Sequence, residues 1–242
     1  MKRRLALKSG NRCAFPDCPR NLSVDATPSD PGAITGEIAH IAGENPTAAR
    51  YDGSMSDEER REYANLIYLC GDHHTQVDRQ EKTFPIGRLR EFKAKHERHV
   101  FERLRAAQPN IGFAELEVLT KAIAGPRAAF DNNLDLLPIR EKMTKNDISE
   151  ASYGLLTMAT STTGETSRFV EQYAALNPDF PNQIRAGFQA EYRRLFAGGF
   201  RGDDLFVALC DFASSGSSDI LRMATGIGIV GYLFELCEVF ER

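Results

Sequence analysis

The sequence predicts an α+β fold in which a small N-terminal domain with two short strands precedes an all-α C-terminal domain. Two short apolar stretches, residues 33–41 and 64–69, have the length and composition of strands. After residue 112 the apolar residues recur at helical spacing instead. The side-chain chemistry is divided in the same way, because all five His lie before residue 100 and the second part is acidic. Any reactive site is therefore expected in the first part of the 242-residue chain.

Helical signals complete the first part. Residues 56–63 form a helical turn, because Ser56 and Glu59 have the spacing of a capping box. A charged helix is expected over residues 85–107, and the Pro, Asn and Gly residues within 108–112 end it.

The second part carries only helical patterns, which Pro, Gly and Ser interrupt. Domains are therefore expected at residues 1–107 and 125–242, with a connecting helix over 108–124. The helices expected in the second part cover residues 113–123, 146–160, 167–176, 183–196, 203–212 and 218–240.

The composition is that of an ordinary soluble chain, with 42% apolar and 26% charged residues. The most apolar stretch, residues 223–234, is shorter than the about 20 residues that a membrane span needs. The basic first residues are not followed by the apolar run of a signal peptide. A cytoplasmic protein without a membrane partner is therefore expected, and its Cys residues are thiols or metal ligands more often than disulfides.

Two pairs of metal-binding residues lie in the first part. Cys13 and Cys18 have the spacing C-x4-C, and Cys70 and His73 have the spacing C-x2-H. Each pair lies at a turn with Pro or Gly, so its two side chains can converge on one ion. Two such pairs suit tetrahedral zinc, and we expect one structural Zn²⁺ that stabilises this small domain. The alternative is that the Cys residues are buried thiols.

Three further polar residues accompany these ligands. His40 lies on the first predicted strand, Asn65 begins the second, and His74 directly follows His73. Because adjacent helical residues point about 100° apart, one of the paired His can face the zinc and the other a different site. The doubled His therefore indicates two functions.

This ordered set resembles the HNH endonuclease family, whose ββα-metal fold places a His on one strand, an Asn on the next and a His on the following helix. The resemblance rests on residues 39–40, 65–70 and 73–74, and it covers about residues 4–97. It is closest to the HNH domains of bacterial anti-phage effectors. It implies a metal-dependent DNA endonuclease, an antiviral effector that hydrolyses phosphodiester bonds.

The resemblance also implies roles for individual residues. His40 would be the general base that takes a proton from water, and Asn65 would orient it through its side-chain amide. His74 would bind a catalytic Mg²⁺ or Mn²⁺ that stabilises the charge of the transition state. Asp78, one helical turn later, would orient His74, although taken alone it could equally pair with a surface cation.

The sequence departs from the family at one position. Many members carry an Asp directly before the first His as a metal ligand, and here that position is Ala39. The nearest carboxylate is Glu37, which alternation along a strand places on the face opposite to His40. Either the strand bulges and Glu37 binds the catalytic metal, or the second ligand comes from elsewhere.

Basic residues provide candidate DNA contacts. Arg4 and Arg12 belong to a basic start, and Arg50 lies in the loop between the strands. Phosphate contacts of this kind give salt-dependent binding that is largely independent of base sequence. The Arg and Lys residues of the helix over 85–107 have an alternative role, since Glu residues at helical spacing can pair with them.

The C-terminal part has five characteristic segments, residues 133–143, 180–188, 202–206, 214–219 and 232–240. They resemble the C-terminal domain of ABC-three-component bacterial defence systems. That resemblance implies a module that joins the effector to a second copy of itself, as a homo-oligomer, or to an SMC-like ABC ATPase. Gly226, Gly228 and Gly231 within one apolar helix indicate a close helix approach, either within the fold or across a dimer.

A metal-dependent DNA endonuclease is therefore the expected function. The alternative is a non-catalytic zinc-bearing adaptor that binds nucleic acid or an ATPase. An adaptor would need the zinc ligands but not His40, Asn65 and His74. Cleavage of RNA stays open as well, because the chemistry takes place at the phosphate.

Overall fold

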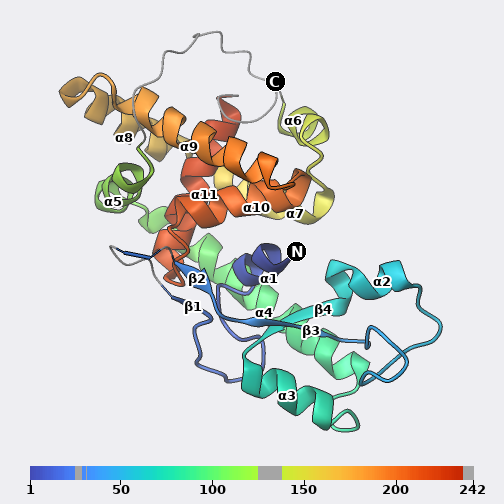
Figure 1. Ribbon diagram of the computed structural model, residues 1–242. Coiled ribbons are helices and arrows are strands. Elements are labelled where there is room, and N and C mark those ends of the chain that lie inside the picture. Colours follow the sequence, from blue (N-terminus) through green and yellow to red (C-terminus); the bar gives the residue numbers. More distant parts are fainter. Residues whose placement is uncertain (25–28, 31, 125–137, 237–242) are drawn as a thin grey trace. The chain divides into compact units, whose positions relative to one another are not determined.

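The computed structural model forms two compact units, Met1–Glu102 and Arg103–Arg242 (Figure 1). The first unit contains two small antiparallel sheets and the second is helical, which confirms the predicted α+β organisation. The residues that the structure describes are 1–24, 29–30, 32–124 and 138–236.

The elements of the first unit are α1 (Lys2–Lys8), β1 (Ser23–Val24), β2 (Ala33–Ile34), β3 (Glu37–His40), α2 (Asp57–Arg61), the 3-10 helix η1 (Tyr63–Asn65), β4 (Leu66–Leu69), α3 (Gly71–Arg79) and α4 (Ile86–Ala107), which continues into the second unit. β1 pairs with β2, and β3 pairs with β4, both antiparallel. The β3–β4 register sets Glu37 opposite Leu69 and His40 opposite Leu66. Because α3 follows β4 directly and packs against β3, these three elements form a ββα unit.

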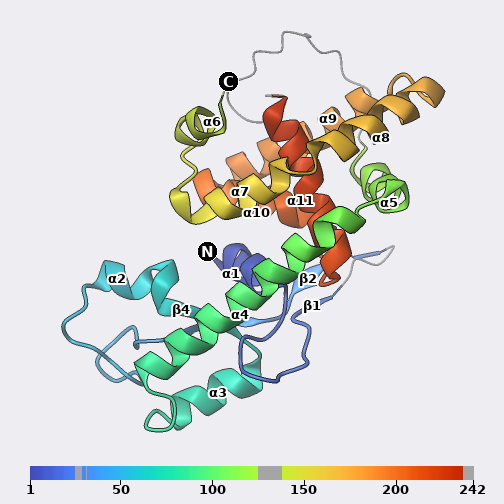
Figure 2. The ribbon, with the colours of Figure 1, turned by 180° about the vertical axis from the view of Figure 1, so that it is seen from behind.

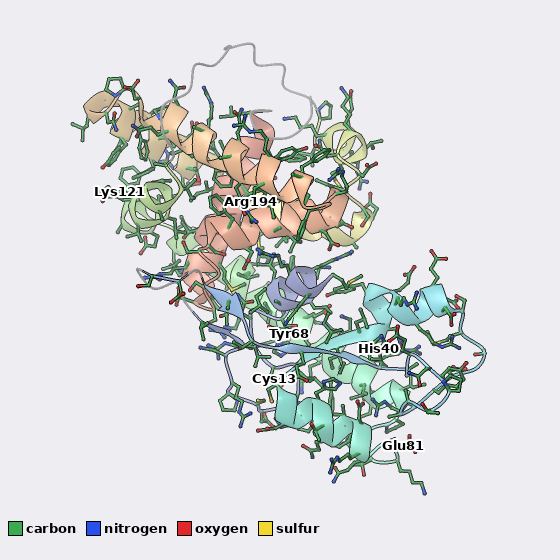
Figure 3. All side chains as sticks on the ribbon, in the orientation of Figure 1. Cys13, His40, Tyr68, Glu81, Lys121 and Arg194 are labelled. Atoms are coloured by element: carbon green, nitrogen blue, oxygen red, sulfur yellow. The ribbon has the colours of Figure 1, made fainter. Side chains whose placement is uncertain are left out.

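The first predicted strand, residues 33–41, is interrupted at Gly36. The backbone N–H of Gly36 donates to the hydroxyl of Tyr68 (3.2 Å), and this hydroxyl donates to the carbonyl of Leu22 (3.0 Å). A side chain at Gly36 would overlap with the buried Tyr68 ring, which is labelled in Figure 3. The N–H of Gly36 is thus bonded to the Tyr68 side chain and not to a neighbouring strand. β2 and β3 belong to separate sheets.

The N-terminus of α2 has the predicted capping box. The N–H of Glu59 donates to Oγ of Ser56 (3.2 Å), and the N–H of Ser56 donates to Oε2 of Glu59 (2.7 Å). The helix is shorter than the predicted 56–63, because Tyr63–Asn65 wind into η1 directly before β4.

One apolar core holds the ββα unit together with α1 and the start of α4. Leu5, Ile67, Val77 and Leu89 within it have no exposed surface. The sequence does not predict α1, because its apolar part is short and lies between cations. Burial of Leu5 against the sheet stabilises this helix, which is too short to be stable alone.

The helices of the second unit are η2 (Gln108–Asn110, 3-10), α5 (Phe113–Ile123), α6 (Ile139–Lys145), α7 (Glu150–Thr160), α8 (Thr163–Leu176), α9 (Phe180–Ala197), α10 (Gly202–Ala213) and α11 (Ile220–Glu235). α11 lies among α5, α7, α8 and α10 and packs against each of them (Figure 2). The sequence patterns do not predict α6. Residues 125–137 of the expected C-terminal domain, and the end of the helix expected over 218–240, lie outside the described residues.

The glycines of α11 make their close approaches within the second unit. A Cβ on Gly226 would lie 2.6 Å from the backbone nitrogen of Ser214, and a Cβ on Gly231 would overlap with the backbone of Ala159. Gly228 faces the side chain of Thr162. Of the two alternatives that the sequence left open, packing inside the fold explains these glycines. Among the helices of the described residues, none has the length and apolar character to cross a membrane.

Candidate functional site

Four side chains of the first unit converge on one point. The ligand atoms of Cys13, Cys18, Cys70 and His73 all lie within 4.8 Å of one another. Nδ1 of His73 is 3.2 Å from Sγ of Cys70 and 3.5 Å from Sγ of Cys13. Cys70 is the residue before α3 and His73 lies in its first turn, so the helix start brings one ligand pair together. These are the four residues predicted to form one metal site, and the structure confirms that they form a single group.

This donor set fits zinc, since three thiols and one imidazole are a common tetrahedral ligand set. The backbone N–H of Cys70 donates to Sγ of Cys13 (3.3 Å), a contact that favours the thiolate form. Burial raises the pKa of Cys13 to about 12, so this thiol would ionise only with a metal ion beside it. Burial lowers the pKa of His73, which keeps its imidazole in the neutral, metal-binding form.

An aromatic cluster supports the Cys3His group. The ring of Phe15 stacks on the ring of His73 with 3.9 Å between centroids, and it contacts Phe84 and Phe92 edge to face. The stacking fixes the imidazole and links the loop that carries Cys13 to the start of α4. Because protein side chains supply all four donors, the group is typical of a structural zinc site.

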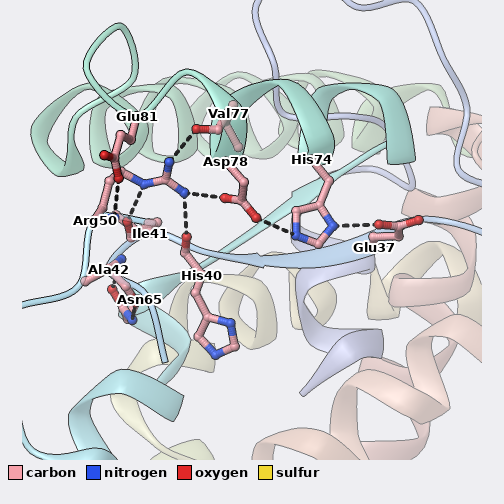
Figure 4. Close-up of polar contacts among 10 residues, drawn as sticks. All are labelled: Glu37, His40, Ile41, Ala42, Arg50, Asn65, His74, Val77, Asp78 and Glu81. Carbon is pink, nitrogen blue, oxygen red and sulfur yellow. Dashed lines mark hydrogen bonds and ion pairs between the residues drawn. The ribbon is translucent and has the colours of Figure 1, made fainter. Parts of the chain in front are cut away.

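His74 lies on the same helix as His73, but its side chain contacts a different set of residues. Its Nδ1 lies 2.5 Å from Oε2 of Glu37 on β3, and its Nε2 lies 3.4 Å from Oδ2 of Asp78, one helical turn later (Figure 4). The side chains of His74, Glu37 and Asp78 are 28%, 51% and 43% exposed, so solvent and a ligand can reach them. The structure thus brings three of the predicted site residues together, and Glu37 reaches His74 without a bulge in β3.

His40 does not join this group. The regular β3–β4 register places its side chain on the face of β3 opposite to Glu37, and in Figure 4 its ring points away from α3. The imidazole is half-buried and makes no hydrogen bond to any residue that the structure describes. Its two ring nitrogens are therefore available to a ligand on that face.

Asn65 is 2% exposed, and its side-chain amide is fully used by the backbone. Its Oδ1 accepts from the N–H of Ala42 (2.9 Å), and its Nδ2 donates to the carbonyls of Ala42 (2.8 Å) and Arg60 (2.9 Å). No contact between this amide and the His40 ring is present. Asn65 therefore fixes the backbone just after His40, and any effect on the imidazole is indirect.

Arg50, predicted from its loop position to contact phosphate, is a buried part of the site. Its side chain is only 4% exposed, and Nη2 donates to Oδ1 of Asp78 (2.6 Å) and to the carbonyl of His40 (3.2 Å). Nε donates to the carbonyl of Ile41 (2.9 Å), and Nη1 donates to the carbonyl of Val77. A phosphate could bind this guanidinium only by replacing these partners. No local sequence signal reveals the network, because its members come from three separate segments.

The other two predicted DNA contacts lie near the N-terminus. The Arg4 guanidinium lies over the ring of Tyr63, 4.6 Å from its centroid. Arg12 pairs with Asn21 in an isolated antiparallel bridge. Both arginine side chains are half-buried.

A scan against protein-family models finds no match, and a search of curated proteins finds none either. The function must therefore be argued from the residues of the site.

Proposed function

We propose that this chain is a metal-dependent endonuclease that hydrolyses phosphodiester bonds of DNA. The observation that carries the proposal is the position of His74, at the start of the helix of a ββα unit and between the carboxylates of Glu37 and Asp78. A metal ion in the adjacent Cys3His group would hold that helix start in place. A solvent-accessible imidazole with a carboxylate beside a ring nitrogen offers a divalent metal one nitrogen and one oxygen donor at a phosphate-cleaving site.

The residues at His74 fit a hard divalent ion. Mg²⁺ and Mn²⁺ favour carboxylate oxygen, and Mg²⁺ commonly binds one or two carboxylates together with water and phosphate oxygens. Glu37 and Asp78 contact opposite nitrogens of the His74 ring, so an ion at one nitrogen would have one of these carboxylates beside it. When bound, the ion would stabilise negative charge on the phosphate oxygens. The second carboxylate would then orient the imidazole from its other nitrogen.

His40 is the proposed general base. None of the described residues forms a hydrogen bond with its half-buried imidazole, and Asn65 and Arg50 fix the backbone around His40. An imidazole in this state can accept a proton from the attacking water.

Exposed cations on α4 support contact with a nucleic acid. Arg90, Lys95 and Arg98 are exposed, and no carboxylate of the described residues forms an ion pair with them. Among the described residues, Lys93 of α4 forms an ion pair with Glu97, and this pair is largely buried. Exposed cations of this kind would bind the phosphate backbone without reading base sequence.

Plasmid nicking tests this proposal. The purified chain is expected to nick supercoiled plasmid with Mg²⁺ or Mn²⁺, and His74→Ala is expected to abolish most of that activity. His99→Ala, which alters an exposed His on α4, is the matched control and should nick like the parent. A parent chain that carries zinc yet leaves plasmid intact with either ion would contradict the proposal.

A second candidate function is a non-catalytic zinc-bearing adaptor for nucleic acid or an ATPase. The observation that favours it is the placement of His40 and His74 on opposite sides of β3, because one phosphate must meet both residues in the nuclease mechanism. An adaptor would bind DNA or a partner and show no cleavage. The same nicking assay, combined with a DNA-binding measurement, separates the two functions.

For the cellular role we propose an effector of bacterial anti-phage defence whose second unit joins it to a second copy or to an SMC-like ABC ATPase. The support is the resemblance of the C-terminal segments. Since α11 is buried inside the second unit, such contacts would have to use outer residues, among which Val118 and Leu176 are exposed and apolar. Light scattering of the chain, with and without a candidate ATPase, would reveal which association occurs.

A further inference from the structure

We propose that Arg50 is a positioning residue that sets the orientation of His74 by acting through Asp78. The inference rests on the proposed function, in which His74 works at the phosphate. In this inference the buried Arg50 binds acceptors within the protein and does not contact DNA.

The contacts of Arg50 need a guanidinium. Three backbone carbonyls and one carboxylate surround it, from β3, the residue that follows β3, and α3. The planar group carries five donors in a fixed fork, so it can satisfy all four acceptors at once. A Lys ammonium would reach only some of them from a single nitrogen. A buried Arg with this many partners is held in one conformation, which suits it to hold another residue in place.

Asp78 transmits this order to His74. One carboxylate oxygen, Oδ1, accepts from Arg50 (2.6 Å), and the other, Oδ2, faces Nε2 of His74 (3.4 Å). Asp78 is 43% exposed, so without Arg50 its side chain would be free to rotate toward solvent. With Oδ1 fixed, Oδ2 stays directed at the imidazole. The partner of a metal-binding His typically acts in this way, by orienting the ring.

The same guanidinium connects β3, which carries His40, with α3, which carries His74. It donates to the carbonyl of His40 at the end of β3 and to the carbonyl of Val77 on α3. The Arg50 backbone has a φ of +58°, and its N–H donates to Oε2 of Glu81 (3.3 Å). The loop therefore turns at Arg50 so that its side chain points inward between strand and helix.

A double-mutant cycle tests the inference. Arg50→Lys, Asp78→Asn and the double variant are compared with the parent for cleavage of a DNA duplex with Mg²⁺. Asp78→Asn is expected to lower kcat by about 10–100-fold, the usual effect of losing a residue that orients a metal ligand, and Arg50→Lys is expected to lower kcat by no more than this, with little change in KM. If Arg50 acts through Asp78, the double variant is no slower than Asp78→Asn alone. The inference would be overturned if the rate losses of the two single variants multiplied in the double variant. A rise in KM for Arg50→Lys without a fall in kcat would overturn it as well.

A second readout does not depend on activity. Long-range ¹H–¹⁵N spectra of the imidazoles at one fixed pH are expected to show a shifted His74 in Arg50→Lys and an unshifted His99. An unchanged His74 would overturn the inference even in an active enzyme, whereas a parent that never cleaves DNA would contradict only the proposed function. Zinc content and circular dichroism verify folding, and Arg50→Gln replaces Arg50→Lys in both experiments if the latter does not fold.

Discussion

His73 and His74 are consecutive in the chain, yet their side chains belong to two different groups. His73 lies with the three thiols of the Cys3His group, 3.2 Å from Sγ of Cys70, and His74 lies 2.5 Å from a carboxylate oxygen of Glu37. The rotation of about 100° between neighbouring residues of a helix produces this separation. A metal ion in the Cys3His group would therefore fix the backbone that carries His74.

The first prediction follows from that connection. Cys70→Ser should lose zinc and lower the stability of the first unit, because binding of a structural metal contributes to folding. Elemental analysis of the parent should give one zinc per chain, and thermal melting should show a destabilised variant. Cys210→Ser is the matched control, since Cys210 is a buried thiol of the second unit and should leave the zinc content unchanged. A parent purified without chelator that contains no zinc would contradict the assignment.

The second prediction concerns pH and His96 on α4. Burial lowers the pKa of His96 below its ordinary value of 6.5, and its Nε2–H donates to the carbonyl of Ser9 (3.0 Å). The unfolded chain therefore binds a proton at a higher pH than the folded chain. It follows that the free energy of unfolding decreases as the pH falls through 6.5, and that this loss ends below the folded pKa.

Denaturant unfolding at several pH values measures this effect. His96→Gln should show a smaller decrease below pH 6.5 than the parent. The exposed His99, replaced by Gln in the same helix, is the comparison: it contributes less than burial to the lowered pKa of His96, so His99→Gln should change the pH dependence less than His96→Gln does. Equal slopes for the parent and His96→Gln would show that His96 does not contribute.

Features that residues close together in the sequence determine can be predicted from the sequence alone. The ligand pairs Cys13–Cys18 and Cys70–His73 have characteristic spacings, so the Cys3His group could be predicted in full. The helix over 85–107 and the Ser56 capping box were also predicted correctly from local patterns.

Features that depend on distant partners could not be predicted. The division of the first strand at Gly36 depends on Tyr68, which lies 32 residues away. The inward orientation of Arg50 depends on acceptors in β3 and α3, so the loop sequence alone suggested an exposed cation. The sequence offers Glu37 as a candidate ligand of the catalytic metal, but only the packing of α3 against β3 shows that its carboxylate contacts His74.

The third prediction concerns the close packing of α11. Gly226→Ala should destabilise the second unit by about 1–3 kcal/mol, because its Cβ would lie 2.6 Å from the backbone nitrogen of Ser214 and neither helix can give way cheaply. Gly164→Ala on α8 is the control: nothing lies within 4 Å of its Cβ, and Ala should be neutral or stabilising by up to about 1 kcal/mol. Equal melting temperatures for the two variants would contradict this account of the glycines.

The fourth prediction concerns the role of His40. If His40 is the general base, His40→Ala should lower kcat for DNA cleavage by about 10²–10⁴-fold, the usual contribution of such a group. Stability and zinc content should change little, because the imidazole makes no hydrogen bond to the described residues and lies on the opposite face of β3 from His74. Cleavage rates, thermal melting and elemental analysis together measure these effects.

Comparison with His74→Ala decides which histidine takes the proton. Loss of a metal-binding residue should raise the Mg²⁺ concentration needed for half-maximal cleavage, whereas loss of the base should lower the rate at every Mg²⁺ concentration. If His40→Ala cleaves DNA as fast as the parent while His74→Ala is inactive at saturating Mg²⁺, His40 is not the base. Catalysis would then have to take place on the α3 side of β3, where Glu37 could orient His74 as the proton acceptor.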